Sequence, residues 1–350
     1  VYSETMYALN TSTAQYGAGG MFAFSAPSIS CSNPLLTPSE LAALCTPANI
    51  AANQAAFGGT GDRITLYTAR RSVESSGRTD NYTSNSIREV IGSNGSINDA
   101  WSYDAYGQYG ISSVEDFEGG NLGIQQINNA LDVVTDPKTG APVCKSVLTG
   151  TDPACVPWNI WQKDGVTPDQ LRYLLIQATH TANATEYIVN RSITGDLGKY
   201  GIRIPTSSDP ISVNLGTEYR QESFSFNPDY VYANGLYSGG NGVSPPVSGN
   251  FHVNEFFFEA KVPLIDNLPA AYHLGFEGGY RYSDYSSGFN TNTYKLGLEW
   301  APIQDLKLRG SYNRAVRAPN ISELYAPTIY GTDGADPCWG QTPKFTVAEC

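Results

Sequence analysis

The chain has 350 residues, of which 35 are glycine, 23 are tyrosine and only 15% are charged, a composition typical of a turn-rich β protein rather than a helical one. It has no run of about 18 apolar residues, which excludes a helical membrane protein. The formal net charge of −12 and the lack of a basic stripe argue against nucleic acid as a partner, and a solvated acidic exterior is the simplest explanation of the charge.

The beginning of the chain, residues 1–62, is predicted to be a loop region. It shows no sustained periodicity, apart from a short helical pattern at Pro38–Leu44 that Thr37 can cap. Residues 63–350 are predicted to form strands separated by turns and long loops. Alternating segments at Arg63–Val73 and Tyr82–Ile91 indicate the first strands, and the dipeptide Asn94-Gly95 is a strong hairpin signal.

The middle of the chain is predicted to hold a strand that starts at Trp101 and a long loop over residues 113–182. This loop contains helical patterns near Leu122–Val134 and Thr167–Gln177, and Pro168 suits the first position of the second helix. Further predicted elements follow in chain order: strands at Ala184–Thr194 and Ile211–Glu222, a Gly-rich aromatic loop at 227–249 and a last loop at 318–350.

The clearest pattern lies between Phe251 and Arg317, where four segments in a row alternate between apolar and charged residues. Each segment has roughly 10 residues or more, the length that a tilted transmembrane β-strand requires. The first segment illustrates the pattern of all four. One face carries Phe256, Phe258, Ala260, Val262 and Leu264, while the other carries Glu255, Glu259 and Lys261, with Phe257 as the exception.

Two architectures suit such strands, a soluble sandwich or barrel with an apolar core and a membrane barrel whose apolar face looks outward. In the sandwich the charged face is the solvated exterior. Tyr280, Tyr282 and Tyr294 lie at one end of their strands and Trp300 at the other, as interfacial aromatic girdles do. Short turns also alternate with long loops, which favours the barrel.

Six cysteines form three local pairs, and closing a short loop is the simplest pairing for each of them. Such disulfides imply an oxidising compartment. No CxxC motif is present and the three histidines are scattered, so neither a metal site nor a catalytic constellation is predicted. The predicted disulfides are Cys31 with Cys45, Cys144 with Cys155, and Cys338 with Cys350.

One segment resembles a known family. Residues 309–324 read RGSYNRAVRAPNISEL, which resembles the barrel signature of TonB-dependent outer-membrane receptors, in particular those common in sphingomonad- and caulobacter-like bacteria. The segments Gly279–Ser286 and Tyr294–Pro302 look like the two strands that precede this signature. Weaker similarity extends through Ala130–Pro137 and Ser192–Leu197.

The resemblance implies an all-β fold, a transmembrane antiparallel β-barrel with long extracellular loops in the bacterial outer membrane. Receptors of this kind have a roughly 22-stranded barrel closed by an N-terminal plug. The sequence shows no plug and only eight or nine strands, so we expect it to be a portion of such a barrel. Expected partners are outer-membrane lipid and lipopolysaccharide, a TonB-type energy transducer that acts through the plug, a small or oligomeric solute, and a surface lipoprotein. No cofactor is implied, and the composition leaves open whether calcium bridges the acidic loops.

The expected function is active uptake of a scarce solute such as a siderophore or carbohydrate. A non-transporting surface barrel that binds a protein or polysaccharide is the alternative, and a secreted β-rich hydrolase comes third. Inward-facing charges are predicted to hold the plug, with direct lining of the solute path as the competing interpretation: Arg220, Glu255, Glu259, Glu277, Arg281, Lys295, Glu299, Lys307, Arg309 and Arg317. Loop aromatics are predicted to bind the solute, unless they pack as loop cores: Trp158, Trp161, Tyr230, Tyr232, Tyr237, Tyr325, Tyr330 and Trp339.

Overall fold

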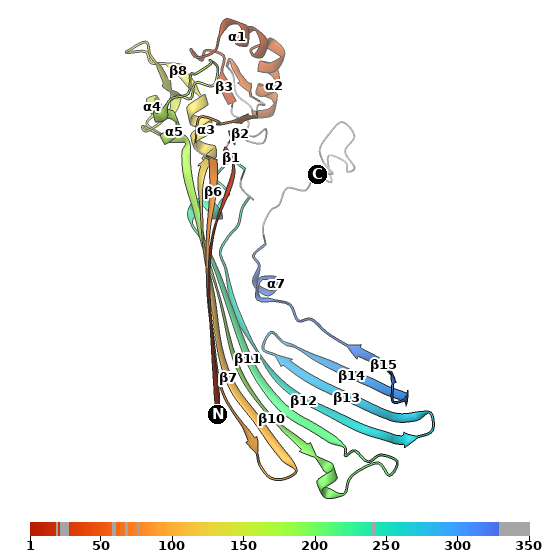
Figure 1. Cartoon of the computed structure of the whole chain (residues 1–350). Helices are drawn as coiled ribbons and strands as arrows, with labels where there is room; N and C mark the ends of the chain where they lie inside the picture. The colour runs from red at the N-terminus through yellow and green to blue at the C-terminus, as the bar shows by residue number, and fades with distance from the viewer. Residues whose placement is uncertain are drawn as a thin grey trace.

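The computed structural model describes residues 1–18, 20–21, 28–57, 61–66, 69–75, 77–239 and 242–328. Its main element is a nine-stranded antiparallel sheet, in which strands that follow one another in the chain are neighbours (Figure 1). The sheet is open, because β1 and β15 form its two edges. Across the sheet the strands are β1 (Tyr2–Ala18), β6 (Gly77–Ser96), β7 (Trp101–Leu122), β10 (Leu175–Asp196), β11 (Ser212–Pro228), β12 (Val247–Leu268), β13 (Ala271–Tyr285), β14 (Phe289–Ile303) and β15 (Leu306–Arg314).

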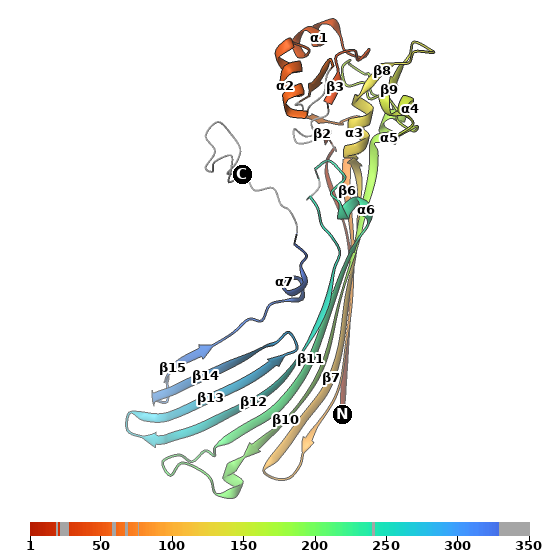
Figure 2. The ribbon, with the colours of Figure 1, turned by 180° about the vertical axis from the view of Figure 1, so that it is seen from behind.

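The sheet curves like part of a barrel wall, and helix α7 (Ile321–Tyr325) lies on its hollow side (Figures 1 and 2). The hydroxyl of Tyr325 donates to the carbonyl of Asn250 at 2.6 Å. The Tyr325 ring fills the space that a side chain at Gly249 would need, since a Cβ there would lie 2.2 Å from the ring. Helix α7 therefore identifies the inner face of the sheet.

The four strand segments predicted between Phe251 and Arg317 are confirmed as β12 to β15. Tight turns connect them. Asn267 and Ala270 adopt the left-handed φ of 57° at the turn between β12 and β13, and Gly288, with φ of 89°, closes the next turn. The last strand ends at Arg314, so the prediction that Arg317 belongs to it is wrong. Arg317 instead forms an ion pair with Glu323 of α7 at 2.7 Å.

The prediction of a loop region over residues 1–62 is wrong for its first part. Strand β1 occupies Tyr2–Ala18 and pairs with β6 along almost its whole length. Most of β1 consists of Thr, Ser, Asn, Gln, Ala and Tyr on both faces, so the strand carries no apolar alternation that a sequence pattern could show.

The predicted turn at Asn94-Gly95 is also wrong, because these residues lie inside β6 opposite Asp104 and Tyr103. The chain reverses at residues 97–100 instead. The side chain of Asn98 accepts hydrogen bonds from the backbone N–H groups of Ala100 and Trp101, at 2.8 and 3.0 Å. An Asn side chain that satisfies two backbone donors in this way stabilises a turn without any glycine.

The segment Arg63–Val73 was expected to form a strand of the barrel, and the structure shows two short strands outside the large sheet. Strand β4 (Arg63–Thr65) pairs with β3 (Ser28–Ser30), and β5 (Arg70–Arg71) pairs with β2 (Gly20–Met21).

The long loops are shorter than predicted because β7, β10, β11 and β12 extend beyond their apolar parts. The loop at 113–182 is reduced to 123–174, and the loop at 227–249 to 229–246. In the last loop, 318–350, the structure describes residues up to 328 only.

The main hydrophobic core lies in a cap at one end of the sheet (Figure 1). Two segments that are distant in sequence build it. Ile29 and Ile64 come from the first segment and Leu131, Trp158 and Leu174 from the second, all with 2% exposure or less. The cap contains α1 (Pro38–Leu44), α2 (Pro47–Phe57), α3 (Ile124–Leu131), β8 (Val133–Thr135), β9 (Pro142–Cys144), α4 (Lys145–Thr149) and α5 (Pro168–Leu174), besides β3 and β4.

The predicted helices of the cap are confirmed, and two begin with a capping box. In α1 the side chain of Thr37 accepts from the backbone of Glu40, whose carboxylate accepts from the backbone of Thr37. In α5 the same exchange joins Thr167 and Gln170. These reciprocal bonds satisfy N–H groups that the first helical turn leaves without partners, and they define where both helices start.

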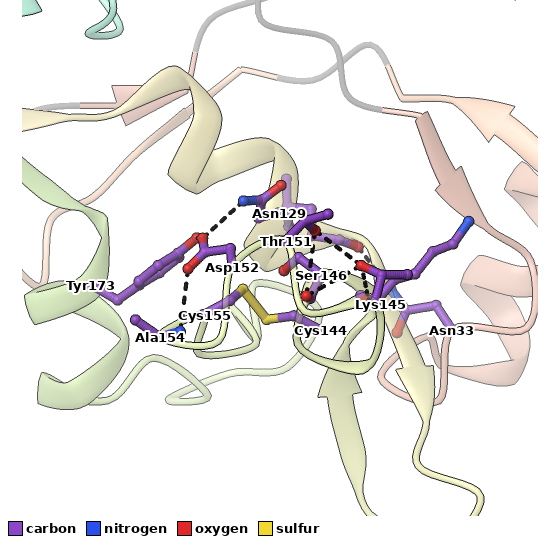
Figure 3. Close-up of a disulfide and its surroundings, with 12 residues drawn as sticks. Asn33, Asn129, Cys144, Lys145, Ser146, Thr151, Asp152, Ala154, Cys155 and Tyr173 are labelled. Carbon is purple, nitrogen blue, oxygen red and sulfur yellow. Dashed lines mark hydrogen bonds between the residues drawn. A yellow bond between two sulfur atoms is a disulfide. The ribbon is translucent and has the colours of Figure 1, made fainter.

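Two of the three predicted disulfides are confirmed, Cys31–Cys45 and Cys144–Cys155, and the third pair lies outside the described residues. Beside the second disulfide, Asp152 accepts hydrogen bonds from the side chains of Asn129 and Tyr173, at 2.9 and 2.5 Å (Figure 3). The hydrogen bond from Tyr173 is the main reason why the pKa of Asp152 is lowered. The disulfide and this carboxylate together tie the loop at 145–155 to α3 and α5.

Candidate functional site on the inner face

The two faces of the sheet have opposite chemistry, because lateral pairing carries each side-chain row across several strands on the same face. On the outer face apolar side chains are exposed, with Phe256 at 45% and Leu298 at 49%. An extensive exposed apolar face marks a membrane or protein contact. One laterally paired outer row consists of Tyr103, Ile193, Leu215, Phe258, Tyr280 and Tyr294.

This apolar band covers only one part of the long strands. Tyr109 and Tyr187 pair laterally near the limit of the apolar band that is nearer to the cap. Between these residues and the cap the outer face becomes polar, so the cap-side parts of β6, β7, β10 and β11 extend beyond the apolar band. Two successive outer rows there are Asn85, Ser113, Asn183 and Ser225, and then Thr83, Glu115, Thr181 and Asn227.

The charged residues of β11 to β15 that were predicted to face inward share the inner face by parity and register. That they hold a plug stays a prediction. Glu255 is the most enclosed of them, with a side chain 6% exposed. It accepts hydrogen bonds from Arg281 Nη1 and Ser283 Oγ, both at 2.6 Å. The guanidinium of Arg281 also lies 5.0 Å from the ring centre of Phe257. Phe257, the exception to the apolar pattern, is thereby a packing partner for an inner cation.

The other predicted charges also form local ion pairs on this face. Arg220 pairs with Glu222. Lys295 lies 3.6 Å from Glu277. Glu299 is bound by Lys307 at 2.6 Å and by Arg309 at 3.0 Å. Glu259 lies on the same face and lines a hollow of about 550 Å³ together with Lys261, Glu277, Arg281 and Lys295.

The predicted loop aromatics divide into buried and accessible side chains. The prediction that Trp158 contacts solute is wrong, because it is completely buried in the cap core. Trp161 packs against the same core, and Tyr237 is only 4% exposed. Tyr230 is 76% exposed and is the most accessible candidate among them. Tyr232 packs 4.6 Å from the His180 ring. Tyr325, the last residue of α7, packs against Gly249 of β12 and is 44% exposed, while Tyr330 and Trp339 lie outside the described residues.

The structure adds a cluster that the sequence pattern did not reveal. Asp80 of β6, Asp116 and Glu118 of β7 and His180 of β10 meet on the inner face above the apolar band. Asp116 and His180 are lateral partners, as are Asp80 and Glu118. All four residues have even numbers, and on three laterally paired strands this parity places them on the same inner face. The pattern can be recognised only when β7 is known to continue to Leu122.

In the described part of the chain, no group of three or more His, Cys, Asp or Glu side chains has an arrangement that could hold a metal ion. None of the helices there is long and apolar enough to cross a membrane. The inner face offers an array of paired charges and hydrogen-bonding groups, which suits reversible polar contacts.

Comparison with known proteins identifies the family. A family model described as TonB dependent receptor-like, beta-barrel matches residues 46–345. No curated protein and no solved structure matches the chain. The narrower resemblance to receptors of sphingomonad- and caulobacter-like bacteria stays a prediction. The match covers most of the chain, including the strands that carry the inner charges and the outer apolar band, and we conclude that the chain belongs to the TonB-dependent receptor-like β-barrel family of outer-membrane proteins.

Proposed function

We propose that the chain is part of an outer-membrane receptor that takes up a scarce solute, such as a siderophore or a carbohydrate, with energy from a TonB-type transducer. The observation that carries the proposal is the division of one sheet into an apolar, aromatic outer face and a charged inner face. Such a sheet suits lipid on one side and an aqueous lumen on the other. The family is one of receptors and transporters rather than enzymes, and no observation on the described residues favours a surface adhesin or a hydrolase.

The cap is positioned to take part in solute capture. It stands on the strand ends that rise above the apolar band, where the outer face is polar. Its core and two disulfides hold it as a compact unit. Tyr230, on the loop between β11 and β12, presents a flat, exposed ring of the kind that binds sugars and aromatic ligands. We therefore assign initial binding of the solute to the cap and to this loop.

The inner ion pairs suit a plug that is seated and released. Exposed pairs such as Glu299 with Arg309 contribute only about 0–1 kcal/mol each. Groups held so weakly can exchange one partner for another at little cost. Enclosed Glu255 keeps its own partner Arg281 in place, so its pair stiffens the wall. Lipopolysaccharide on the outer face, a surface lipoprotein over the loops and calcium at acidic loops remain proposed partners.

The test is uptake by cells that express the complete receptor. A panel of labelled siderophores and oligosaccharides is offered to cells with an active transducer, to cells lacking the transducer, and to cells treated with an uncoupler. We expect one solute class to accumulate only in energised cells with the transducer, while surface binding persists without it. Binding of a protein or polysaccharide in all three conditions, without accumulation of any solute, would contradict the proposal.

A further inference from the structure

The cluster of Asp80, Asp116, Glu118 and His180 contains two acids, the buried Asp116 and the half-buried Asp80, that each enclose one carboxylate oxygen without a hydrogen-bond partner. Asp116 is 7% exposed, and its Oδ2 lies 3.6 Å from His180 Nδ1. The Oδ1 atoms of Asp80 and of Asp116 are both buried and have no hydrogen-bond partner. Two such carboxylates are stable side by side when one proton is shared between them, since burying two bare negative charges is costly.

Residues 229–239 cover this cluster. The Tyr237 hydroxyl donates to Glu118 Oε1 at 3.3 Å, and the Tyr232 ring packs against the His180 imidazole. Asp229 begins the covering segment, and its carboxylate accepts from the backbone N–H of Thr179 at 2.7 Å. At the other end, Ser238 N–H donates to Leu122 O at 2.7 Å. The segment is therefore attached to β7 and β10 at both ends, with two tyrosine rings over the acids.

The electrostatics of the site agree with a bound proton. Burial, followed by the neighbouring carboxyl group of Asp80, raises the pKa of Asp116 to about 7. Burial lowers the pKa of His180, so its imidazole is neutral at pH 7 and does not compensate an ionised Asp116. These strand positions lie above the apolar band, where water has access once the cover moves.

Other charged and titratable groups face the pair from each neighbouring element. Burial raises the pKa of Glu118, against the effect of its bond from Tyr237 and of the Arg78 charge. Burial also raises the pKa of Tyr237. The remaining groups are Tyr82 of β6, which pairs laterally with Asp116, and Asp229 and Tyr232 of the covering segment.

We propose that Asp80 and Asp116 share one proton that latches residues 229–239 over the inner face of the barrel, and that loss of this proton releases the segment. With Asp116 ionised, its negative charge is enclosed beside Asp80 and Glu118 under the tyrosine rings. Hydration of these carboxylates requires the cover to lift, because β6, β7 and β10 are locked together by their backbone ladders. The latch would make loop opening depend on external pH, whichever solute is taken up.

The direction in which pH shifts the opening equilibrium of residues 229–239 follows from proton linkage. The closed segment binds the proton more tightly than the open one, so opening releases a proton as pH rises. Between the ordinary pKa of an aspartate and about 7, the opening constant should increase by up to about tenfold per pH unit, and above pH 7 it should level off.

The experiment is hydrogen exchange of the membrane-embedded receptor between pH 5 and 8.5, read by mass spectrometry and corrected for the intrinsic pH dependence of exchange. The informative amides are those of Ser238 and Ile124, whose hydrogen bonds join the segment to the end of β7. In the wild type we expect their protection to fall between pH 5 and 7 and then to level off. Constant protection over this range would overturn the proposal, and this measurement needs no variant.

Three variants sharpen the experiment. Asp116→Asn removes the titrating group and should abolish the pH dependence. Asp80→Asn supplies an amide donor in place of the shared proton, so the protection should level off at a lower pH. Glu115→Gln changes the neighbouring carboxylate, which lies on the outer face, and should leave the wild-type profile intact. An unchanged profile in folded Asp116→Asn, or the same loss in Glu115→Gln, would contradict the latch.

Discussion

The cap and the sheet place the same residue types in opposite surroundings. In the cap, Leu131 and Trp158 are completely buried and two disulfides close the surrounding loops. In the sheet, Leu298 and Phe256 are about half exposed, and the strands are joined by backbone ladders and inner ion pairs. The cap thus has the organisation of a small secreted domain, whereas the sheet completes its apolar contacts only with lipid.

Trp158→Ala is expected to have the largest effect, and only on the cap. Removing a completely buried tryptophan side chain costs about 3–5 kcal/mol in transfer free energy and cavity formation. We expect the cap to become sensitive to limited proteolysis while the barrel stays in the membrane. Tyr230→Ala, at an exposed position, is the control and should leave proteolysis unchanged. Equal resistance of the two variants would show that the cap does not depend on its core.

Leu296→Lys tests the outer face at the middle of the apolar band. A lysine that faces lipid near the midplane costs about 2–4 kcal/mol in barrel stability. Ser311→Lys adds the same side chain on the inner face of the adjacent strand, opposite Gly297, and should cost far less. Urea unfolding of the protein in liposomes measures both free energies. If Ser311→Lys were the more damaging variant, the assignment of the two faces would be reversed.

The Cys144–Cys155 disulfide is expected to contribute less than the core. It closes a loop of 11 residues, for which the chain-entropy argument gives about 2–3 kcal/mol. Cys144→Ala/Cys155→Ala should raise hydrogen exchange in residues 145–155 and leave exchange in β12 and β13 unchanged. Faster exchange throughout the sheet would mean that cap and barrel unfold together.

Arg281→Ala and Arg309→Ala are a matched pair on the inner face, with the smallest expected effects. Arg281→Ala leaves the enclosed Glu255 carboxylate with Ser283 as its remaining bond and should cost about 1–3 kcal/mol. Arg309 is 71% exposed, and Lys307 still pairs with Glu299 when it is removed, so its loss should cost less than about 1 kcal/mol. Unfolding in liposomes measures both free energies. Equal losses of stability in the two variants would show that the enclosure of Glu255 does not make its ion pair more important than that of Glu299.

Strands were predictable from the sequence where one face contacts lipid, and were missed where both faces contact water. Strands β12 to β15 were predicted because lipid on one side and water on the other impose strict alternation from Phe256 to Tyr312. Strand β1 and the upper parts of β7 and β10 were missed because water contacts their outer face, where no apolar alternation is needed. The acid cluster around Asp116 was missed for the same reason, since it lies on these extensions. The helix starts at Thr37 and Thr167 were predictable because capping is a local interaction.

The sequence by itself determined the β class, the two faces of the strands, the local disulfides and the family resemblance, because each depends on residues close together in the chain. Only the tertiary structure decided which aromatic side chains are buried. Trp158 and Tyr230 look alike as loop aromatics, yet one packs between segments that are about a hundred residues apart in the chain and the other faces solvent. The proximity of Asp80, Asp116 and His180 was likewise decided by strand register, because three distant segments had to pair before their side chains could meet.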